Sequence, residues 1–133
     1  MNDIILNKDN YNKIFVISQQ SILDIYNTKN LFDFDFNLIV VEENESSKSV
    51  ISAEKTINLL LTQGCTKDSL LIGFGGGSVT DFTGFIASIF MRGINHIFVP
   101  TTLLGMIDAS IGGKTGLSTS QSKNTIGTFY QPQ

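Results

Sequence analysis

The fold of this chain is decided by one stretch, residues 70–81, which reads LLIGFGGGSVTD. Its opening residues are mostly apolar, and a short apolar run of this kind is typical of a buried strand. Three glycines follow, and beyond them apolar residues recur at helical spacing, at Phe82, Phe85, Ile86, Ile89 and Phe90. The stretch therefore predicts a strand, a glycine turn and an amphipathic helix, which together form the repeating unit of parallel α/β sheets.

The same alternation of strand and helix occurs upstream of the glycine turn. The predicted elements are a strand at 14–17, a weak helix at 22–26, a strand at 37–41 and a clear helix at 50–61. Ser47 or Ser49 can cap the first amides of the clear helix. Gly64 is expected to end it, because glycine adopts the left-handed cap conformation at no steric cost.

Downstream of the turn, residues 96–99 are a predicted strand closed by Pro100, and residues 102–108 are a possible helix. Residues 112–133 are rich in Gly and Ser and are predicted to be mostly loop. The order of elements predicts a Rossmann-like parallel sheet with helices on both faces. Residues 1–133 are interpreted as one domain.

Composition and charge restrict the class of protein. The chain has 133 residues, 41% of them hydrophobic and 16% charged, as expected of a folded domain. Its net charge of -3, without a basic stripe, argues against a nucleic-acid partner. Cys65 is the only cysteine, so no intrachain disulfide can form, and it is interpreted as a small core or loop residue. Without a signal peptide or an apolar run of roughly 18 residues, no membrane partner is expected and a cytoplasmic location is predicted.

The glycine turn is a candidate ligand site, because ligands of parallel α/β sheets bind where strands end and helices begin. Glycine lets the backbone approach a phosphate, and the first helical amides have no partners within the helix. The candidate residues are Gly76, Gly77, Ser78, Val79, Thr80 and Asp81, the last as an acceptor for ribose or nicotinamide groups. The turn matches neither GxGxxG nor a Walker loop, so a plain turn with Asp81 as a helix-start acid stays open.

Further polar residues follow the strand at 96–99. Thr101 and Thr102 stand at its carboxyl end, where they can cap a helix or hold a ligand. Asp108 is either a helix-end acid or an acceptor in a site. His96, the only histidine, lies within the apolar strand and is interpreted as a packed side chain, since one histidine without clustered partners does not make a metal site.

Three cations complete the set of candidate residues. Lys114 lies in a Gly-rich segment, and Lys123 stands beside Asn124 in a second polar segment. Lysines suit phosphate or carboxylate groups as point charges, although a lone lysine is usually a solvated surface residue. Arg92, at the end of the helix after the glycine turn, is either a partner of the helix dipole or an anion ligand that reaches a neighbouring subunit.

Several short motifs occur in order along the chain: Gly75-Gly76-Gly77, Asp81, Gly84-Phe85, Met91-Arg92-Gly93, Pro100-Thr101-Thr102-Leu103-Leu104, Asp108, Gly112-Gly113-Lys114-Thr115, Lys123-Asn124, Ile126-Gly127 and Phe129-Tyr130-Gln131-Pro132. In order and spacing they resemble the 3-dehydroquinate synthase family of sugar-phosphate cyclases. Upstream, residues 44–49 resemble the family's acidic-to-lysine stretch, which meets the adenosine side of NAD. The match is strong from about residue 70 to the end.

The resemblance implies a role for each matched residue. NAD would be held by Glu45, Lys48, Gly76, Gly77, Ser78, Val79, Thr80, Asp81, Thr101, Thr102, Lys114 and Lys123. The boundary between NAD and substrate would be lined by Asp108, Lys114, Lys123 and Asn124, with Lys114, Asn124 and Asp108 as catalytic groups. Arg92 would contact the phosphate of the substrate, a phosphorylated sugar acid, across the interface of a homodimer.

The family reaction converts 3-deoxy-D-arabino-heptulosonate 7-phosphate to 3-dehydroquinate and phosphate, a lyase step of the shikimate pathway to chorismate and the aromatic amino acids. NAD transiently oxidises a ring alcohol, and a divalent metal, zinc or cobalt, polarises the reacting oxygens. In the family the metal ligands, a Glu and two His, come from a helical domain after the Tyr-Gln-Pro segment. The resemblance therefore implies the N-terminal domain of a two-domain enzyme, without metal ligands and inactive alone.

The chain also departs from the family pattern. Thr80 and Ser122 stand where the family usually has Gly, Ser118 where it has Asn, and residues 18–20 lack the acid expected after the first strand. Three alternatives stay open: another sugar-phosphate cyclase, a domain of a polyol or iron-type alcohol dehydrogenase, and a non-catalytic nucleotide-binding module. Dehydrogenases share the Gly-Gly-Gly-Ser-x-x-Asp run, and Ser78 suits them better than the cyclases.

Overall fold

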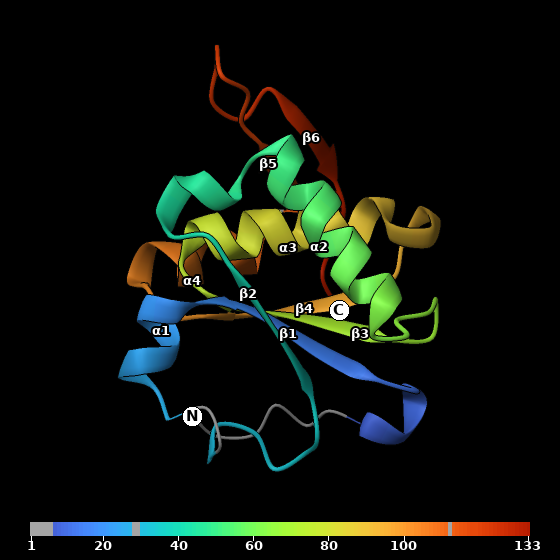
Figure 1. The fold of residues 1–133 in the computed structure, drawn as a ribbon. Helices are drawn as coiled ribbons and strands as arrows, with labels where there is room; N and C mark the ends of the chain where they lie inside the picture. Colours follow the sequence, from blue (N-terminus) through green and yellow to red (C-terminus); the bar gives the residue numbers. More distant parts are fainter. Residues whose placement is uncertain (1–6, 28–29, 112) are drawn as a thin grey trace.

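The computed structural model describes residues 7–27, 30–111 and 113–133, without the side chains of residues 108–111. Strands and helices alternate along the chain as the sequence predicts (Figure 1). The elements are β1 (Ile14–Gln19), α1 (Gln20–Ile25), β2 (Asn37–Val41), α2 (Val50–Thr62), β3 (Leu70–Gly75), α3 (Gly77–Ile89), β4 (Asn95–Pro100), α4 (Leu103–Ile111), β5 (Lys114–Leu117) and β6 (Ile126–Phe129). Short 3-10 turns lie at Lys8–Asn10, Asn44–Ser47 and Phe90–Arg92.

Four strands form one parallel sheet in the order β2-β1-β3-β4. The two central strands, β1 and β3, are buried along their whole length, which explains why their sequences are nearly continuous apolar runs. All four strands run in one direction, so their carboxyl ends lie at the same edge of the sheet. The parallel α/β fold predicted from the sequence is confirmed.

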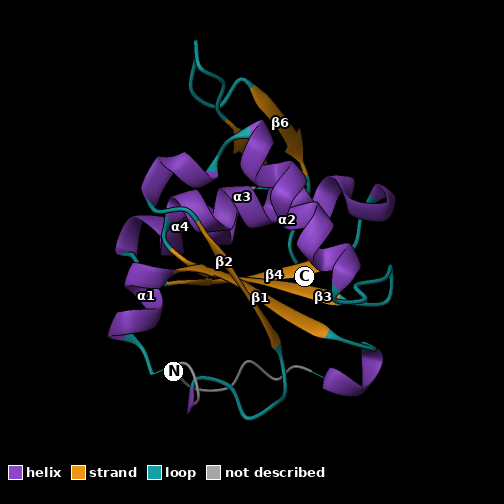
Figure 2. Cartoon of the chain, viewed as in Figure 1, coloured by secondary structure: helices purple, strands orange, loops and turns teal. Residues whose placement is uncertain are grey.

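Two apolar clusters lie on opposite faces of the sheet. On one face, Phe15 and Leu71 pack with Leu60 of α2 and Phe82 of α3. On the other face, Phe74 packs with side chains of α1 and of the aromatic segment 31–36. Figure 2 shows α2 and α3 together on one side of the sheet and α1 away from them. Helices on both faces are thus confirmed, although the aromatic segment 31–36 covers much of the face on which α1 lies.

The ends of α2 follow the local rules of helix capping. The Ser49 side chain accepts a hydrogen bond from the Ser52 amide at 3.1 Å, so the cap is Ser49. Ser47, the alternative candidate, instead donates its hydroxyl to the Asn44 carbonyl at 3.0 Å. After the helix, Gly64 has φ +79°, the left-handed conformation expected at a helix end. In the described ranges no helix is long and apolar enough to cross a membrane.

Residues 114–117 and 126–129 pair as an antiparallel hairpin, so the prediction of a loop-rich segment was wrong here. The two strands are only four residues long and contain Gly and Thr, which leaves no alternating apolar pattern to detect. The hairpin depends on packing of β5 against α3. Gly84 of α3 permits this approach, because a Cβ there would lie 2.7 Å from Cγ2 of Thr115.

The two residues interpreted as packed side chains are both buried. His96 is 1% exposed, and its ring stacks on Tyr130 with 5.1 Å between the ring centroids. Burial lowers the pKa of His96 to about 4. Cys65 lies in the core cluster beneath α2, and burial raises the pKa of its thiol. Neither residue lies at the glycine turn, so the structural interpretation of both is confirmed.

Candidate functional site

The glycine turn lies at the carboxyl edge of the sheet, between the last residue of β3, Gly75, and the first of α3, Gly77. Gly76 occupies the cap position, and no side chain in the described part of the chain caps the first turn of α3. A Cβ on Gly77 would meet no described atom within 4 Å, so this side of the turn is open. The first amides of α3 therefore keep donors for an anionic ligand.

The other residues of the turn contribute in different ways. The Thr80 amide donates to the Gly76 carbonyl at 3.0 Å, and the Thr80 hydroxyl donates to the Gly77 carbonyl at 3.1 Å. Both groups are used inside the helix. Val79 is fully buried, so only its backbone is a candidate for contact with a ligand. The accessible donors of the turn are consequently the amides at its tip.

Thr101 and Thr102 lie next to the glycine turn, because the Thr101 amide donates to the Gly75 carbonyl at 2.9 Å. The Thr102 hydroxyl accepts from the Gly105 amide at 3.0 Å and so caps α4, as the capping alternative predicts. The Thr101 hydroxyl is buried and has no hydrogen-bond partner among the described residues. Such a group costs about 1–3 kcal/mol. A ligand atom that bonds this hydroxyl would remove that cost.

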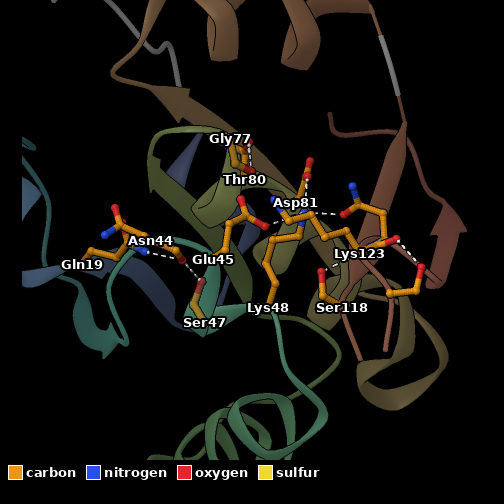
Figure 3. A network of polar contacts seen from close by, with 12 residues as sticks. Gln19, Asn44, Glu45, Ser47, Lys48, Gly77, Thr80, Asp81, Ser118 and Lys123 are labelled. Carbon is orange, nitrogen blue, oxygen red and sulfur yellow. Dashed lines mark hydrogen bonds and ion pairs between the residues drawn. The ribbon is translucent and has the colours of Figure 1, made fainter. Parts of the chain in front are cut away.

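A network of polar contacts centred on Lys48 lies beside α3 (Figure 3). The Lys48 ammonium donates to Oδ2 of Asp81 at 2.9 Å and to Oδ1 of Asn124 at 2.5 Å. It also forms an ion pair with Oε2 of Glu45 at 3.6 Å. Lys48 is only 2% exposed, whereas the side chains of Asp81 and Glu45 are 40% and 54% exposed. The structure thus brings together four of the predicted site residues from three separate segments.

The loop between β5 and β6, residues 118–125, is held against this network and is called the hairpin loop below. The Ser118 amide donates to the Lys48 carbonyl at 2.7 Å. The Ser118 hydroxyl accepts from the Asn124 amide at 3.2 Å. Asn124 has φ +52°, a conformation that asparagine tolerates better than most residues. Lys123 precedes it on the loop and is exposed.

Two residues with a role at this edge were not identified from the sequence. Gln19, in the stretch that lacks the acid expected after the first strand, donates to the carbonyls of Glu42 at 2.8 Å and Asn44 at 3.1 Å and so supports the segment before Lys48. Ser118, noted only as a departure from the family, positions Asn124. The Gln19 contacts join residues more than 20 positions apart, and the Ser118 contact lies within a loop whose conformation no sequence pattern signals.

The remaining candidate cations lie away from the glycine turn. Lys114 begins β5, and with a rise of about 3.4 Å per residue it stands roughly 10 Å from the end of the strand where the hairpin loop begins. Arg92 follows the far end of α3, about 18 Å along the helix from the turn. Both side chains are exposed. Asp108 belongs to α4, but its side chain lies outside the described residues.

The described residues also include no cluster of three or more His, Cys, Asp or Glu that could hold a metal ion. The polar groups of the site are instead amides, hydroxyls, two carboxylates and a buried ammonium. This set of groups suits a ligand with phosphates and hydroxyls better than a bare cation.

A parallel sheet whose glycine turn opens a helix at the carboxyl edge defines the Rossmann-like, dinucleotide-binding class of α/β domains. Within that class, this chain belongs to the 3-dehydroquinate synthase family, because the family model described as 3-dehydroquinate synthase N-terminal matches residues 38–133. A 3-dehydroquinate synthase of Dictyoglomus thermophilum is 43% identical over 125 residues, which are 94% of this chain and 35% of the relative. The chain spans about a third of the length of the curated relatives it matches.

Solved structures agree with this assignment. The 2-epi-5-epi-valiolone synthase of Streptomyces hygroscopicus, with NAD+ and Zn2+ bound, matches with TM-score 0.84 and 28% identity, over 98% of this chain and 38% of that one. Glycerol dehydrogenase of Schizosaccharomyces pombe matches with TM-score 0.63 and 19% identity, over 95% and 31%. At that identity the dehydrogenase shares the fold alone. Family membership therefore places the chain with the cyclases.

Proposed function

We propose that residues 1–133 are the NAD-binding domain of a 3-dehydroquinate synthase that converts 3-deoxy-D-arabino-heptulosonate 7-phosphate to 3-dehydroquinate and phosphate. The observation that carries the proposal is the buried hydroxyl of Thr101, which has no partner among the described residues, beside a glycine turn that no described side chain caps. Both features leave hydrogen-bonding capacity that a dinucleotide would use. Membership in the family, and the NAD+ bound to a cyclase of similar fold, support NAD as that dinucleotide.

The cofactor would lie across the carboxyl edge of the sheet. Its pyrophosphate suits the amides of Gly77 and Ser78, because the start of a helix carries a partial positive charge. Thr101 would gain its missing partner, and Asp81 would accept a hydrogen bond from a hydroxyl of the cofactor. The wall of the site would be completed by Glu45, Lys48, Gly76, Val79, Thr80, Thr102 and Lys123. Lys114, which begins β5 away from the glycine turn, would serve the boundary with the substrate.

When bound, NAD supplies an acceptor that takes a hydride from a ring carbon and later returns it. The residues of this chain bind and orient the substrate beside it. Lys114 and Lys123 would attract its carboxylate or phosphate, and Asn124 would hold a hydroxyl, with Asp108 as a further acceptor. Arg92 is placed far from the turn, so the proposal assigns it to the substrate of the neighbouring subunit in a homodimer.

The divalent metal of the family does not fit the described residues, which include no suitable cluster of ligands. Its ligands would belong to the rest of a longer enzyme. A second domain is also supported by α4, where Leu103, Leu104, Met106 and Ile107 are each about half exposed or more. Apolar side chains grouped in this way usually mark a surface that another domain covers. The 133-residue chain alone is therefore expected to release no phosphate from the heptulosonate phosphate.

Calorimetric titration with NAD tests the proposal. The 133-residue chain is expected to bind NAD with a dissociation constant of roughly millimolar or tighter, and Asp81→Ala should weaken binding about tenfold, since a hydrogen bond to a charged group is lost. Asp68→Ala, in the exposed turn before β3, is the matched control and should bind as the parent does. Absence of binding at several millimolar NAD, about the weakest affinity of interest, would contradict the proposal.

A second candidate is a cyclase that acts on a different sugar phosphate. Ser118 favours it, because the family usually has at this position an Asn that touches the substrate, whereas the hydroxyl here is bonded to the Asn124 amide. Phosphate release by the longer enzyme, measured with the heptulosonate phosphate and with other sugar phosphates, separates the two candidates. NAD binding without phosphate release from any of them would instead support a non-catalytic nucleotide-binding module.

A further inference from the structure

Lys48 is an unusual lysine, because its charged group is almost completely removed from water. A buried ammonium is tolerated only when its donors are satisfied, and an ammonium has three of them. Hydrogen bonds to Asp81 and Asn124 satisfy two of them, and the Glu45 carboxylate adds an ion pair at 3.6 Å. The charge of Lys48 is therefore paired within the protein before any cofactor arrives.

The three partners of the Lys48 ammonium belong to different segments. Glu45 lies on the 3-10 turn just before Lys48, Asp81 one turn into α3, and Asn124 on the hairpin loop. Lys48 also accepts the Ser118 amide with its own carbonyl. Lys48 thus contacts the hairpin loop twice, with its backbone carbonyl at Ser118 and with its ammonium at Asn124. The same ammonium also binds Asp81 of α3.

From this geometry we propose that Lys48 is a positioning residue that fixes Asn124 and the hairpin loop against the glycine-turn helix. The resemblance assigns Lys48 to the NAD site as a ligand, whereas its contacts give it a second role that acts through Asn124. The consequence for function rests on the proposed function: cofactor contacts at Asp81 and substrate contacts at Asn124 share one buried ammonium. Binding of the cofactor would therefore change the affinity for the substrate, and binding of the substrate would change the affinity for the cofactor by the same factor.

Amide hydrogen exchange on the 133-residue chain, without NAD, tests the proposal directly. Lys48→Met keeps the apolar stem and removes the donors, and Asn124→Gly removes the acceptor on the loop with a residue that adopts the φ of +52° without strain. Each change should speed exchange of the amides of residues 118–125 roughly tenfold to a hundredfold, the factor expected for one lost charge-assisted hydrogen bond. The double variant should exchange no faster than Lys48→Met, because both changes break one contact.

Two controls separate positioning from a general loss of structure. Lys55→Met makes the same change at an exposed lysine of α2 and should leave the hairpin loop as in the parent. Amides of β3 should stay protected in every variant. The side-chain amide resonances of Asn124 should shift in Lys48→Met and not in Lys55→Met. If Lys48 only stabilised other parts of the fold, these resonances would not shift.

Parent-like exchange of the hairpin loop in Lys48→Met, with β3 still protected, overturns the inference. If Lys48→Met loses protection in β3, the Asn124→Gly variant decides, because Lys48 and its pair with Asp81 stay in place. Unchanged loop exchange in Asn124→Gly overturns the inference equally. Failure of the proposed function looks different. In that case the parent shows no change of any amide on addition of NAD, while the effect of Lys48→Met on the loop persists.

Discussion

Two buried threonine hydroxyls, those of Thr83 and Thr101, have no hydrogen-bond partner in the described part of the chain. Their surroundings differ. Thr83 lies in the interior of α3 and packs against Gly73 of β3, whereas Thr101 follows β4 beside the glycine turn. The unbonded hydroxyl of Thr83 therefore results from close packing in the interior, whereas that of Thr101 is a candidate contact for a ligand.

Thr101→Val and Thr83→Val separate these two cases. Valine has nearly the same shape and lacks the hydroxyl, so each variant should raise the free energy of unfolding of the ligand-free chain by about 1 kcal/mol. Only Thr101→Val should weaken NAD binding, by about tenfold. Chemical denaturation and calorimetric titration measure the two effects. Equal NAD affinity in both variants would remove Thr101 from the site.

Single residues differ in how well the sequence predicts them. The Ser49 cap and the Gly64 helix end follow from local rules, because their partners lie within a few positions. The burial of Lys48 could not be predicted, since lysines are almost never fully buried unless paired. Its partners Asp81 and Asn124 lie 33 and 76 positions away along the chain.

Among the elements, the hairpin β5–β6 depends most on a tertiary contact. Its strand β5 packs against α3, and Thr115 lies directly over Gly84. The hairpin in turn places the loop with Lys123 and Asn124 against Lys48, beside α3. The close approach of α3 and β5 at Gly84 is therefore needed to bring the hairpin loop into the candidate site.

Gly84→Ala tests this dependence. Alanine is the better helix former, but its Cβ would meet Cγ2 of Thr115 at 2.7 Å and Cζ of Phe98 at 3.1 Å. The free energy of unfolding should fall by about 1–3 kcal/mol, the usual cost of overpacking. In a Thr115→Ser background, which lacks Cγ2 and keeps the hydroxyl, the cost should shrink. An equal loss in both backgrounds, measured by denaturation, would argue against this contact.

The turn after α3, residues 90–93, has a strained backbone that side-chain contacts stabilise. Met91 and Arg92 both adopt left-handed backbone angles, with φ 48° and 65°, which costs roughly 1–2 kcal/mol for each residue other than glycine. Lys67 donates to the carbonyls of Met91 at 3.3 Å and Gly93 at 2.9 Å, on either side of Arg92. These contacts stabilise the turn that exposes Arg92, which we propose contacts the substrate of the neighbouring subunit.

For the molecule as a whole, the last described residues return to the sheet. The Gln133 amide donates to the His96 carbonyl at 3.0 Å, and Tyr130 stacks on the His96 ring and donates its hydroxyl to the Ile94 carbonyl at 3.1 Å. Figure 1 shows this end of the chain beside β4. Two backbone carbonyls of residues 94–96 and the buried His96 ring therefore connect the end of the described chain to the edge strand.

Stability is expected to depend on pH through His96. Its pKa is about 4 in the folded chain, because burial disfavours the charged ring, and near 6.5 when unfolded. Between these values the unfolded state binds more protons, so stability falls as the pH drops through 6.5 and levels off near 4. From pH 7 to 5 the expected loss is about 2 kcal/mol.

Denaturation of the parent and of His96→Phe at both pH values checks this expectation. Phenylalanine keeps a ring that can stack on Tyr130 and cannot be protonated, so the variant should lose markedly less stability over the same interval. A parent and a variant with the same dependence on pH would show that other groups, and not His96, cause it.

The sequence by itself determined the parallel α/β fold, the position of the glycine turn and the family, because these depend on apolar periodicity and on short motifs that act locally. It did not determine the hairpin β5–β6 or the buried contacts of Lys48 with Asp81 and Asn124. Those features exist only where helix, strand and loop meet in space. Tertiary structure decided them because a buried charge or a close backbone approach is stable only once all of its partners are in place.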